Sequence, residues 1–355
     1  MTVFESQILG EINLKNKIVM APLTRSRAIN NVPNELMVKY YQQRASAGLI
    51  ITEGTSPSPN GIGYPRIPGA YSDAQIEGWK KIADAVHSDG GKIFVQLMHT
   101  GRITAKVNMP AGSLTLAPSA IQAAGEMFTE DGFVAHEVPK AMTQQEIETT
   151  QNEYALASKR LIKESGVDGI ELHAANGYLL NQFLNTRSNQ RKDHYGGSIE
   201  NRTRFILETA QKVVDEIGSD KVGIRLSPYG AYNDMQSDYE SLEATFVYLS
   251  RELSNLNLAY IHIVDQRVAF GAPDFTVNIK KVIKENFKGI VISGGDVNTL
   301  EKAEAVLESG LDLVYVGRPF ISNPDFVEKL QKKLELVSPD FDTFYTPGEK
   351  GYTDY

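Results

Sequence analysis

The sequence predicts an α/β fold, a (β/α)8 barrel of the TIM type, from three observations. Short β-branched runs alternate with longer segments of helical periodicity along the chain of 355 residues. The short runs are apolar throughout rather than alternating, which is typical of parallel strands covered on both faces. There are eight such runs, which favours a closed barrel. A doubly wound open sheet is the alternative, but no GxGxxG turn follows the first strand.

The predicted elements follow in order along the chain. The strands are 17–22, 49–54, 92–97, 168–173, 222–227, 260–265, 290–295 and 313–318. The amphipathic helices are 72–91, 143–166, 198–218, 239–257, 299–310 and 323–336. Ser72 is a candidate N-cap of the first helix, and Thr143 and Glu146 have capping-box spacing at the start of the second. Gly166 is placed to end the second helix.

One segment departs from the repeat. Residues 98–142, between the third strand and its helix, contain proline, glycine and alternating residues, which predict a hairpin-bearing excursion. Long insertions within a compact domain are usually functional, so we expect a lid over the barrel mouth rather than a second domain. The chain is therefore predicted to be one domain over residues 1–355.

Composition excludes several functions. The net charge is −8, so a nucleic-acid backbone is not an expected partner. No apolar run is long enough to span a membrane and no signal-peptide core precedes the fold, which predicts a cytoplasmic protein without membrane attachment. The chain has no cysteine, which excludes disulfides, thiolate nucleophiles and iron–sulfur clusters. Its six histidines include no HExxH pair, so no metal site is expected.

Candidate site residues, most of them polar or glycine, lie at the ends of the predicted strands, at the barrel end where active sites lie. They are Pro22, Leu23, Thr24, Glu53, Gly54, Gln96, His173, Arg225, Gly294, Gly295, Gly317 and Arg318. Glycines after the last two strands predict a phosphate held on backbone N–H groups, with Arg318 adding a fixed charge. Singly, each feature has a structural alternative, a turn or an ion pair. Their joint occurrence at successive strand ends favours a site.

Four segments carry a resemblance to a known family. APLTRSRA (21–28), HAANGYLLNQFL (173–184), DHYGGSIENRTRF (193–205) and VGRPFISNPD (316–325) resemble the Old Yellow Enzyme family of flavin-dependent ene reductases. The resemblance covers essentially the whole chain. It implies non-covalent FMN, reduced by NADH or NADPH, that reduces an activated alkene in a ping-pong reaction. Enones and nitroalkenes are the implied substrates, with nitrate esters as further candidates.

The resemblance also implies the cofactor residues. Those for the flavin ring are Pro22, Leu23, Thr24, Gly54, Gln96 and Arg225. Those for the phosphate are Gly294, Gly295, Gly317 and Arg318. Thr24 would bond the O4 edge, as in the Thr-bearing branch of the family, and Arg225 would stabilise negative charge near N1.

Three residues are implied in catalysis. His173 and Asn176 would donate to the substrate oxygen as its negative charge develops. Tyr178 would protonate the α-carbon on the face opposite the hydride, because a phenol keeps its proton at neutral pH. The structural alternative is a helix start whose polar residues cap it locally, and the resemblance favours function.

The substrate pocket is also implied by the resemblance. Tyr64, Phe344 and Tyr345 would flank the substrate, against the alternative of loop anchoring, while Arg27 is expected to be structural. Met98 stands where many relatives carry tryptophan, so stereochemical preference cannot be carried over.

Other functions stay open at this point. A flavin-free barrel could act on phosphorylated metabolites, and an FMN-binding barrel could be a non-catalytic scaffold. Flavin barrels with cysteine-ligated clusters are excluded by the lack of cysteine. The expected partners are small α,β-unsaturated molecules, bound by a monomer or homodimer.

Overall fold

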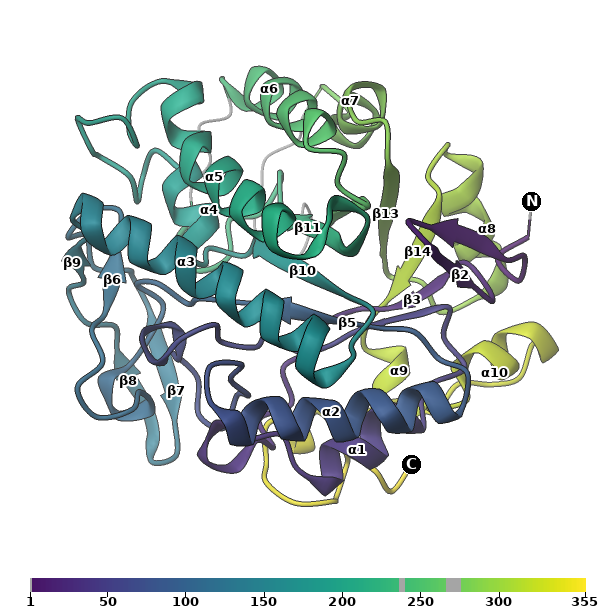
Figure 1. Cartoon of the computed structure of the whole chain (residues 1–355). Coiled ribbons are helices and arrows are strands. Elements are labelled where there is room, and N and C mark those ends of the chain that lie inside the picture. The colour runs from purple at the N-terminus through teal and green to yellow at the C-terminus, as the bar shows by residue number, and fades with distance from the viewer. Residues whose placement is uncertain (1, 236–239, 266–275) are drawn as a thin grey trace.

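The parallel strands close into a barrel with the helices on its outside (Figure 1). The computed structural model describes residues 2–235, 240–265 and 276–355. The strands of the barrel, in order, are β3 (Ile18–Met20), β4 (Leu49–Ile51), β5 (Ile93–Leu97), β10 (Gly169–Ala174), β11 (Val222–Leu226), β12 (Tyr260–Ile263), β13 (Ile290–Gly295) and β14 (Leu313–Val316). β14 pairs with β3 and closes the barrel. The predicted fold class is confirmed, and each predicted strand is present, although four of them end two or three residues before the predicted end.

The helices follow the predicted series. They are α1 (Glu35–Gln42), α2 (Asp73–Ser88), α3 (Gln144–Arg160), α4 (Leu179–Leu184), α5 (Ile199–Ile217), α6 (Leu242–Asn255), α7 (Ile279–Asn286), α8 (Leu300–Glu308), α9 (Pro319–Ser322) and α10 (Phe326–Lys332). Ser72 and Thr143 form the capping boxes of α2 and α3. Residue 239, the start of one predicted helix, lies outside the described residues. The sequence prediction did not include α1, α4, α7 and α9, which are too short to show a clear helical period.

The amino-terminal end of the barrel is closed by an antiparallel hairpin. Its strands are β1 (Gln7–Leu9) and β2 (Ile12–Leu14). Leu9 and Leu14 are fully buried against apolar residues of the barrel interior, including Phe94 and Tyr260. A ligand can therefore approach the barrel interior only from the carboxyl ends of the strands.

The predicted excursion over residues 98–142 does contain a hairpin. β7 (Glu126–Thr129) and β8 (Gly132–Ala135) pair antiparallel, while β6 (Leu116–Ala117) pairs with β9 (Lys140–Ala141). Figure 1 shows the β7–β8 hairpin at the opposite end of the barrel from the β1–β2 hairpin.

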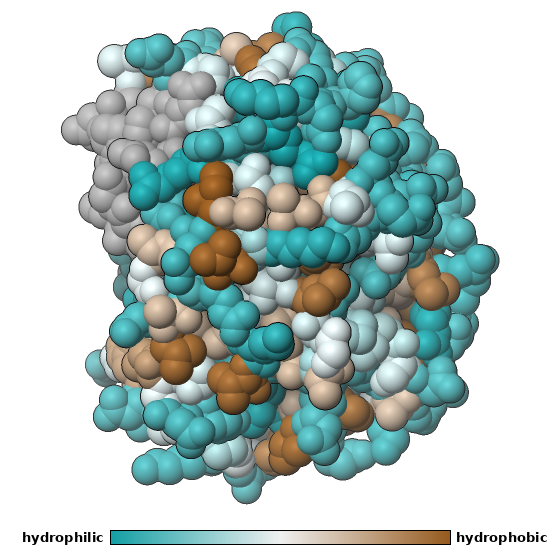
Figure 2. Space-filling model, turned by 90° about the vertical axis from the view of Figure 1, so that its left-hand side faces the viewer, coloured by the Kyte–Doolittle hydropathy of each residue, from teal (hydrophilic) through white to brown (hydrophobic). Residues whose placement is uncertain are grey.

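The face seen in Figure 2 carries hydrophobic side chains scattered among hydrophilic ones. Among the described residues, no helix is long and apolar enough to cross a membrane.

Candidate active site

A cavity of about 560 Å³ lies at the carboxyl ends of the strands. Of the residues predicted for the site, Thr24, Tyr64, Tyr178 and Tyr345 line it. The other walls come from the β7–β8 hairpin and from the carboxyl-terminal segment 341–347. The hairpin residues on the wall are Glu126, Met127, Phe128, Glu130 and Phe133. The size suits a small organic molecule.

The loop after β10 is rigidly held. Asn176 has a left-handed backbone with φ of 59°. Its N–H donates to Ser227 Oγ at 2.9 Å, and its carbonyl accepts from Asn233 Nδ2 at 2.8 Å. The Gly177 N–H donates to Asn181 Oδ1 at 2.9 Å. These bonds fix the backbone between the strand end and α4, so the side chains on this loop have a defined position.

His173 and Tyr178 lie together at the two ends of this loop. Their ring centroids are 4.9 Å apart, edge to face. Burial, and after it the charge of Arg225, lowers the pKa of His173 well below its usual value. Burial raises the pKa of Tyr178 above its usual value. At neutral pH the site therefore holds a neutral imidazole beside a protonated phenol, as the predicted roles require.

Two buried polar atoms of the predicted site residues, neither of them on the cavity wall, have no hydrogen-bond partner among the described residues. They are His173 Nδ1 and Arg225 Nε. The guanidinium of Arg225 contacts the face of the Tyr315 ring, with Cζ 5.7 Å from the centroid. Buried polar groups in folded proteins are usually paired, so an unpaired imidazole and guanidinium suit a ligand that carries oxygen and nitrogen acceptors. The pyrimidine edge of a flavin would present such acceptors to Arg225, and a substrate oxygen would present one to His173.

The other residues predicted for the flavin ring lie around the strand ends. Pro22 is buried, and Leu23 and Thr24 after it are half-buried. Gln96 is buried and donates from Nε2 to Glu171 Oε1 at 2.7 Å. A Cβ on Gly54 would collide with the side chain of Met98, so close packing is sufficient to explain a glycine at this position. Met98 is buried with Ile103 and Tyr178 rather than exposed in the cavity.

The predicted phosphate residues end β13, in the case of Gly294 and Gly295, and follow β14, in the case of Gly317 and Arg318. A Cβ on Gly294 would collide with the Tyr315 carbonyl, so the pairing of the two strands alone requires this glycine. Gly295 has φ of 124°, which only glycine adopts readily. A Cβ on Gly317 would meet only Leu23 Cδ2, at 3.8 Å, so its backbone is open to a ligand. Arg318 is exposed and makes no ion pair with a described residue. Its guanidinium lies over the Phe341 ring, with Cζ 5.5 Å from the centroid. The open backbone at Gly317 beside this cation fits a phosphate.

The predicted aromatic residues divide into two groups. Tyr64 and Tyr345 line the cavity, and the Tyr178 hydroxyl donates to the Tyr64 hydroxyl at 3.0 Å. Phe344 is buried and stacks on Phe341 at 4.8 Å between centroids, outside the cavity wall. A place for Phe344 beside the substrate stays a prediction.

Arginines after the first strand hold the carboxyl-terminal segment. Arg27, expected to be structural, donates to the carbonyls of Phe344 at 2.6 Å and Thr343 at 2.8 Å. Arg25 donates to the Gly351 carbonyl at 2.7 Å. Both guanidiniums are buried, so they fix the segment that carries Tyr345. Arg25 was not predicted to have a role, although two arginines two positions apart after a strand were a signal.

Arg66, which was not predicted from the sequence to belong to the site, lies on the cavity wall. Arg66 makes an ion pair with Glu130 at the tip of the β7–β8 hairpin. It also donates to the carbonyls of Ser26 at 2.8 Å and Tyr345 at 2.7 Å. One side chain thus joins the first strand-end loop, the hairpin and the carboxyl-terminal segment around the cavity.

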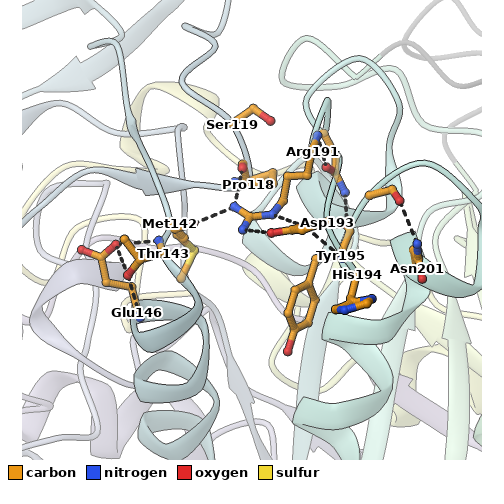
Figure 3. Close-up of polar contacts among 12 residues, drawn as sticks. Pro118, Ser119, Met142, Thr143, Glu146, Arg191, Asp193, His194, Tyr195 and Asn201 are labelled. Atoms are coloured by element: carbon orange, nitrogen blue, oxygen red, sulfur yellow. Dashed lines mark hydrogen bonds and ion pairs between the residues drawn. The ribbon is translucent and has the colours of Figure 1, made fainter.

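Arg191, which Asp193 of the segment DHYGGSIENRTRF holds in place, bonds the base of the excursion (Figure 3). Just before this segment, Arg191 donates to the carbonyls of Pro118 at 2.9 Å and Met142 at 2.6 Å and pairs with Asp193. The Asp193 carboxylate also accepts from the Tyr195 N–H at 3.1 Å. This motif supported the resemblance, but its position is structural: it fixes the excursion to the outer helices.

The fold and the cavity define a barrel enzyme that acts on a small molecule at the carboxyl ends of its strands. Residues 2–336 match the NADH:flavin oxidoreductase / NADH oxidase family. A probable flavin mononucleotide-dependent alkene reductase of Leishmania infantum is 41% identical over 98% of this chain and 95% of its own. Among solved structures, morphinone reductase has a TM-score of 0.94 at 41% identity, with 100% of this chain and 96% of its own covered. The Old Yellow Enzyme homologue from Zymomonas mobilis has a TM-score of 0.95 at 39% identity, with 100% and 99% covered.

The chain therefore belongs to the NADH:flavin oxidoreductase / NADH oxidase family, as a homologue of Old Yellow Enzyme. The predicted family is confirmed, and so are the oxidoreductase class and the FMN cofactor. The match also removes the alternative of a flavin-free barrel.

Proposed function

We propose that this chain reduces the C=C bond of small α,β-unsaturated compounds with electrons from NADH or NADPH, by a ping-pong mechanism through FMN. The observation that carries the proposal is the neutral, unpaired His173 beside the protonated Tyr178 next to the cavity. Alkene reduction is also the activity in the name of the Leishmania relative. Enones and nitroalkenes fit the cavity, and nitrate esters are further candidates.

His173 and Asn176 hold the substrate oxygen in this proposal. When bound, FMN supplies a carrier that takes hydride from the nicotinamide and gives it to the β-carbon of the alkene. Hydrogen bonds from His173 and Asn176 then stabilise the negative charge that develops on the substrate oxygen. Because the loop backbone at Asn176 is fixed from three sides, these donors are preorganised. A non-catalytic scaffold would have no use for a donor pair held in this way.

Tyr178 donates its proton to the α-carbon. Its raised pKa keeps the phenol protonated, and its hydroxyl is turned toward the cavity where Tyr64 accepts its hydrogen bond. When Tyr178 gives up the proton, the Tyr64 hydroxyl can rotate and donate to the phenolate that remains. Tyr64 therefore acts as a positioning residue for the acid.

The cofactor residues are proposed as the resemblance implied, with one adjustment. The ring residues are Pro22, Leu23, Thr24, Gly54, Gln96 and Arg225. Gly295, Gly317 and Arg318 hold the phosphate, while Gly294 keeps β13 close to β14. Met98 supports Tyr178 from behind the cavity. The excursion 98–142 serves as a lid within one domain, because its hairpin forms a wall of the cavity.

We also propose that the protein works in the cytoplasm as a monomer or homodimer. The acidic, cysteine-free composition supports this location. The residues proposed for catalysis and for FMN come from one chain, so a monomer suffices for the chemistry.

Purification with bound FMN and alkene-dependent oxidation of NADH or NADPH would test the function. A panel of enones, nitroalkenes and nitrate esters should include at least one substrate that is reduced at the C=C bond, shown by product analysis. A flavin-loaded protein that oxidises the nicotinamide only with oxygen, and never with an alkene, would reject the proposal.

A further inference from the structure

Inside the barrel, a carboxylate outside the proposed mechanism holds two side chains of the site. Glu171 is fully buried on β10 and directly opposes Gln96 of β5 in the strand register. Its Oε1 accepts from Gln96 Nε2 at 2.7 Å. Its Oε2 lies 2.9 Å from His262 Nδ1, on β12. The register also places Arg225 beside His262 and His173, so the cluster adjoins the catalytic imidazole.

The charge of Glu171 determines which way the Gln96 amide faces. Burial favours the neutral acid, but the interaction with His262, and then the charge of Arg225, lowers the pKa of Glu171. The group is therefore a carboxylate, which only accepts hydrogen bonds. An amide oxygen at the same position would face a carboxylate oxygen and be repelled. Gln96 must therefore turn Nε2 to Glu171.

His262 fixes the second carboxylate oxygen. Burial lowers the pKa of His262 to about 4, so its ring is neutral at neutral pH. Because the carboxylate only accepts, the single N–H of the ring lies on Nδ1 and donates to Oε2. With both oxygens bound, Glu171 cannot rotate to release Gln96.

This orientation leaves the Gln96 oxygen as a free acceptor. No donor among the described residues bonds Gln96 Oε1, and Arg225 Nε, two strands away across β10, is an unpaired donor. A flavin pyrimidine edge presents one N–H between carbonyl oxygens, which requires an acceptor beside donors. Gln96 and Arg225 supply that pattern only with the amide turned as Glu171 turns it.

We propose that Glu171 is a positioning residue for FMN, which acts by orienting Gln96 to accept the flavin N3–H. The inference rests on the proposed place of Gln96 at the pyrimidine edge. Glu171 itself does not touch the cofactor or substrate. Its effect on FMN must therefore pass through Gln96.

A double-mutant cycle on FMN affinity tests this route. Glu171→Gln removes the charge, so the facing amide no longer dictates the orientation of Gln96. FMN should then dissociate about tenfold more readily, the size of one lost hydrogen bond. In a Gln96→Ala background the same change should alter the dissociation constant by about twofold or less. Equal losses in both backgrounds, or no loss in either, would overturn the proposal.

A spectroscopic measurement separates orientation from general loosening of the barrel. In holoenzyme loaded with ¹⁵N-labelled FMN, the N3–H proton resonance should move upfield in Glu171→Gln, because its acceptor is no longer held. Asp168→Asn is a control, since Asp168 is a half-buried acid paired with His87 just before the same strand. That control should lower the melting temperature and leave the N3–H resonance in place. An unmoved resonance in Glu171→Gln, or an equal movement in the control, would count against the proposal.

A second variant covers the case in which Glu171→Gln does not fold. Glu171→Asp keeps the charge but withdraws it by one methylene, beyond hydrogen-bond reach of Gln96, and should show the same coupling. These measurements need neither nicotinamide nor alkene. If the protein reduces alkenes but the Glu171 and Gln96 substitutions act independently on FMN affinity, this inference alone is rejected. If the two substitutions are coupled but no alkene is reduced, the proposed activity alone is rejected.

Discussion

The Tyr178 hydroxyl donates to the Tyr64 hydroxyl at 3.0 Å, and the two rings meet edge to face with centroids 6.2 Å apart. Burial raises the pKa of Tyr64 and of Tyr178, so both phenols keep their protons at neutral pH. A residue predicted only as part of the pocket rim is thus the direct partner of the proposed acid.

Tyr64→Phe should therefore slow alkene reduction without abolishing it. The variant removes the hydrogen bond that aims Tyr178 and steadies its phenolate, a loss of about tenfold in the rate of the oxidative half-reaction. The reductive half-reaction should be nearly unchanged. Stopped-flow measurement of each half-reaction checks this, with Tyr345→Phe as the control on the same cavity wall. Equal slowing by both variants would show that Tyr64 only shapes the cavity.

Arg318→Ala should weaken the retention of FMN. The guanidinium is exposed, so solvent screens its attraction for a phosphate and a loss of about tenfold in affinity is expected. Equilibrium titration of the apoprotein with FMN measures it. Lys332→Ala, which removes an exposed cation paired with Glu328 on α10, should leave the affinity unchanged. An Arg318→Ala variant that binds FMN as tightly as the parent would place the phosphate elsewhere.

Much of this site was predictable because barrels place their chemistry at strand ends. The eight apolar runs located Gln96, His173 and Arg225 at one end of the barrel, and the structure brings them together around Glu171. Their roles toward FMN and substrate stay predictions. The partners of Arg66 could not be predicted, since Glu130 and Tyr345 lie 64 and 279 positions away. Such contacts depend on how the hairpin and the carboxyl-terminal segment fold back, which local periodicity does not encode. The stacking of Phe344 on Phe341 could not be predicted for the same reason.

Stability should fall as the pH is lowered from about 6.5 toward 4. Burial lowers the pKa of His99 to about 3 and of His262 to about 4, and lowers that of His173 as well. In this window the unfolded chain binds protons that the folded protein does not, so acid favours unfolding. Burial raises the pKa of Glu53 to about 7, which gives the opposite trend for that single group. The pKa of His136 is also lowered and that of Glu153 is also raised, so four histidines oppose two carboxyls. The melting temperature should therefore fall as the pH is lowered. A melting temperature that is constant or rises between pH 6.5 and 4.5 would contradict this assignment of neutral buried histidines.

NADH should be the preferred reductant over NADPH. The acidic residues Glu126, Glu130 and Asp342 line the outer cavity, while the cation Arg66 is already bonded to Glu130 and two carbonyls. The 2′-phosphate of NADPH adds negative charge, which such a wall repels. The ratio of kcat/KM for the two nicotinamides should therefore favour NADH, and most strongly at low salt. Glu126→Lys should shift the ratio toward NADPH, and Glu137→Lys, off the cavity wall, should not.

Tyr178→Phe separates the two half-reactions most sharply. Reduction of the bound flavin by nicotinamide needs no proton from this residue, so its rate should change little. Re-oxidation by an enone such as cyclohexenone requires protonation at the α-carbon and should slow by about 10²–10⁴-fold, the contribution of a positioned general acid. Nitroalkene reduction should suffer less, because the nitronate anion is stable enough to leave and be protonated in water. Rapid-mixing experiments on each half-reaction, with both substrates, measure these effects in one enzyme preparation. Because Tyr178 is buried beside His173, a variant that also lost the reductive half-reaction would point to a disturbed flavin site. Loss of that half-reaction with enone reduction spared would show that another group supplies the proton.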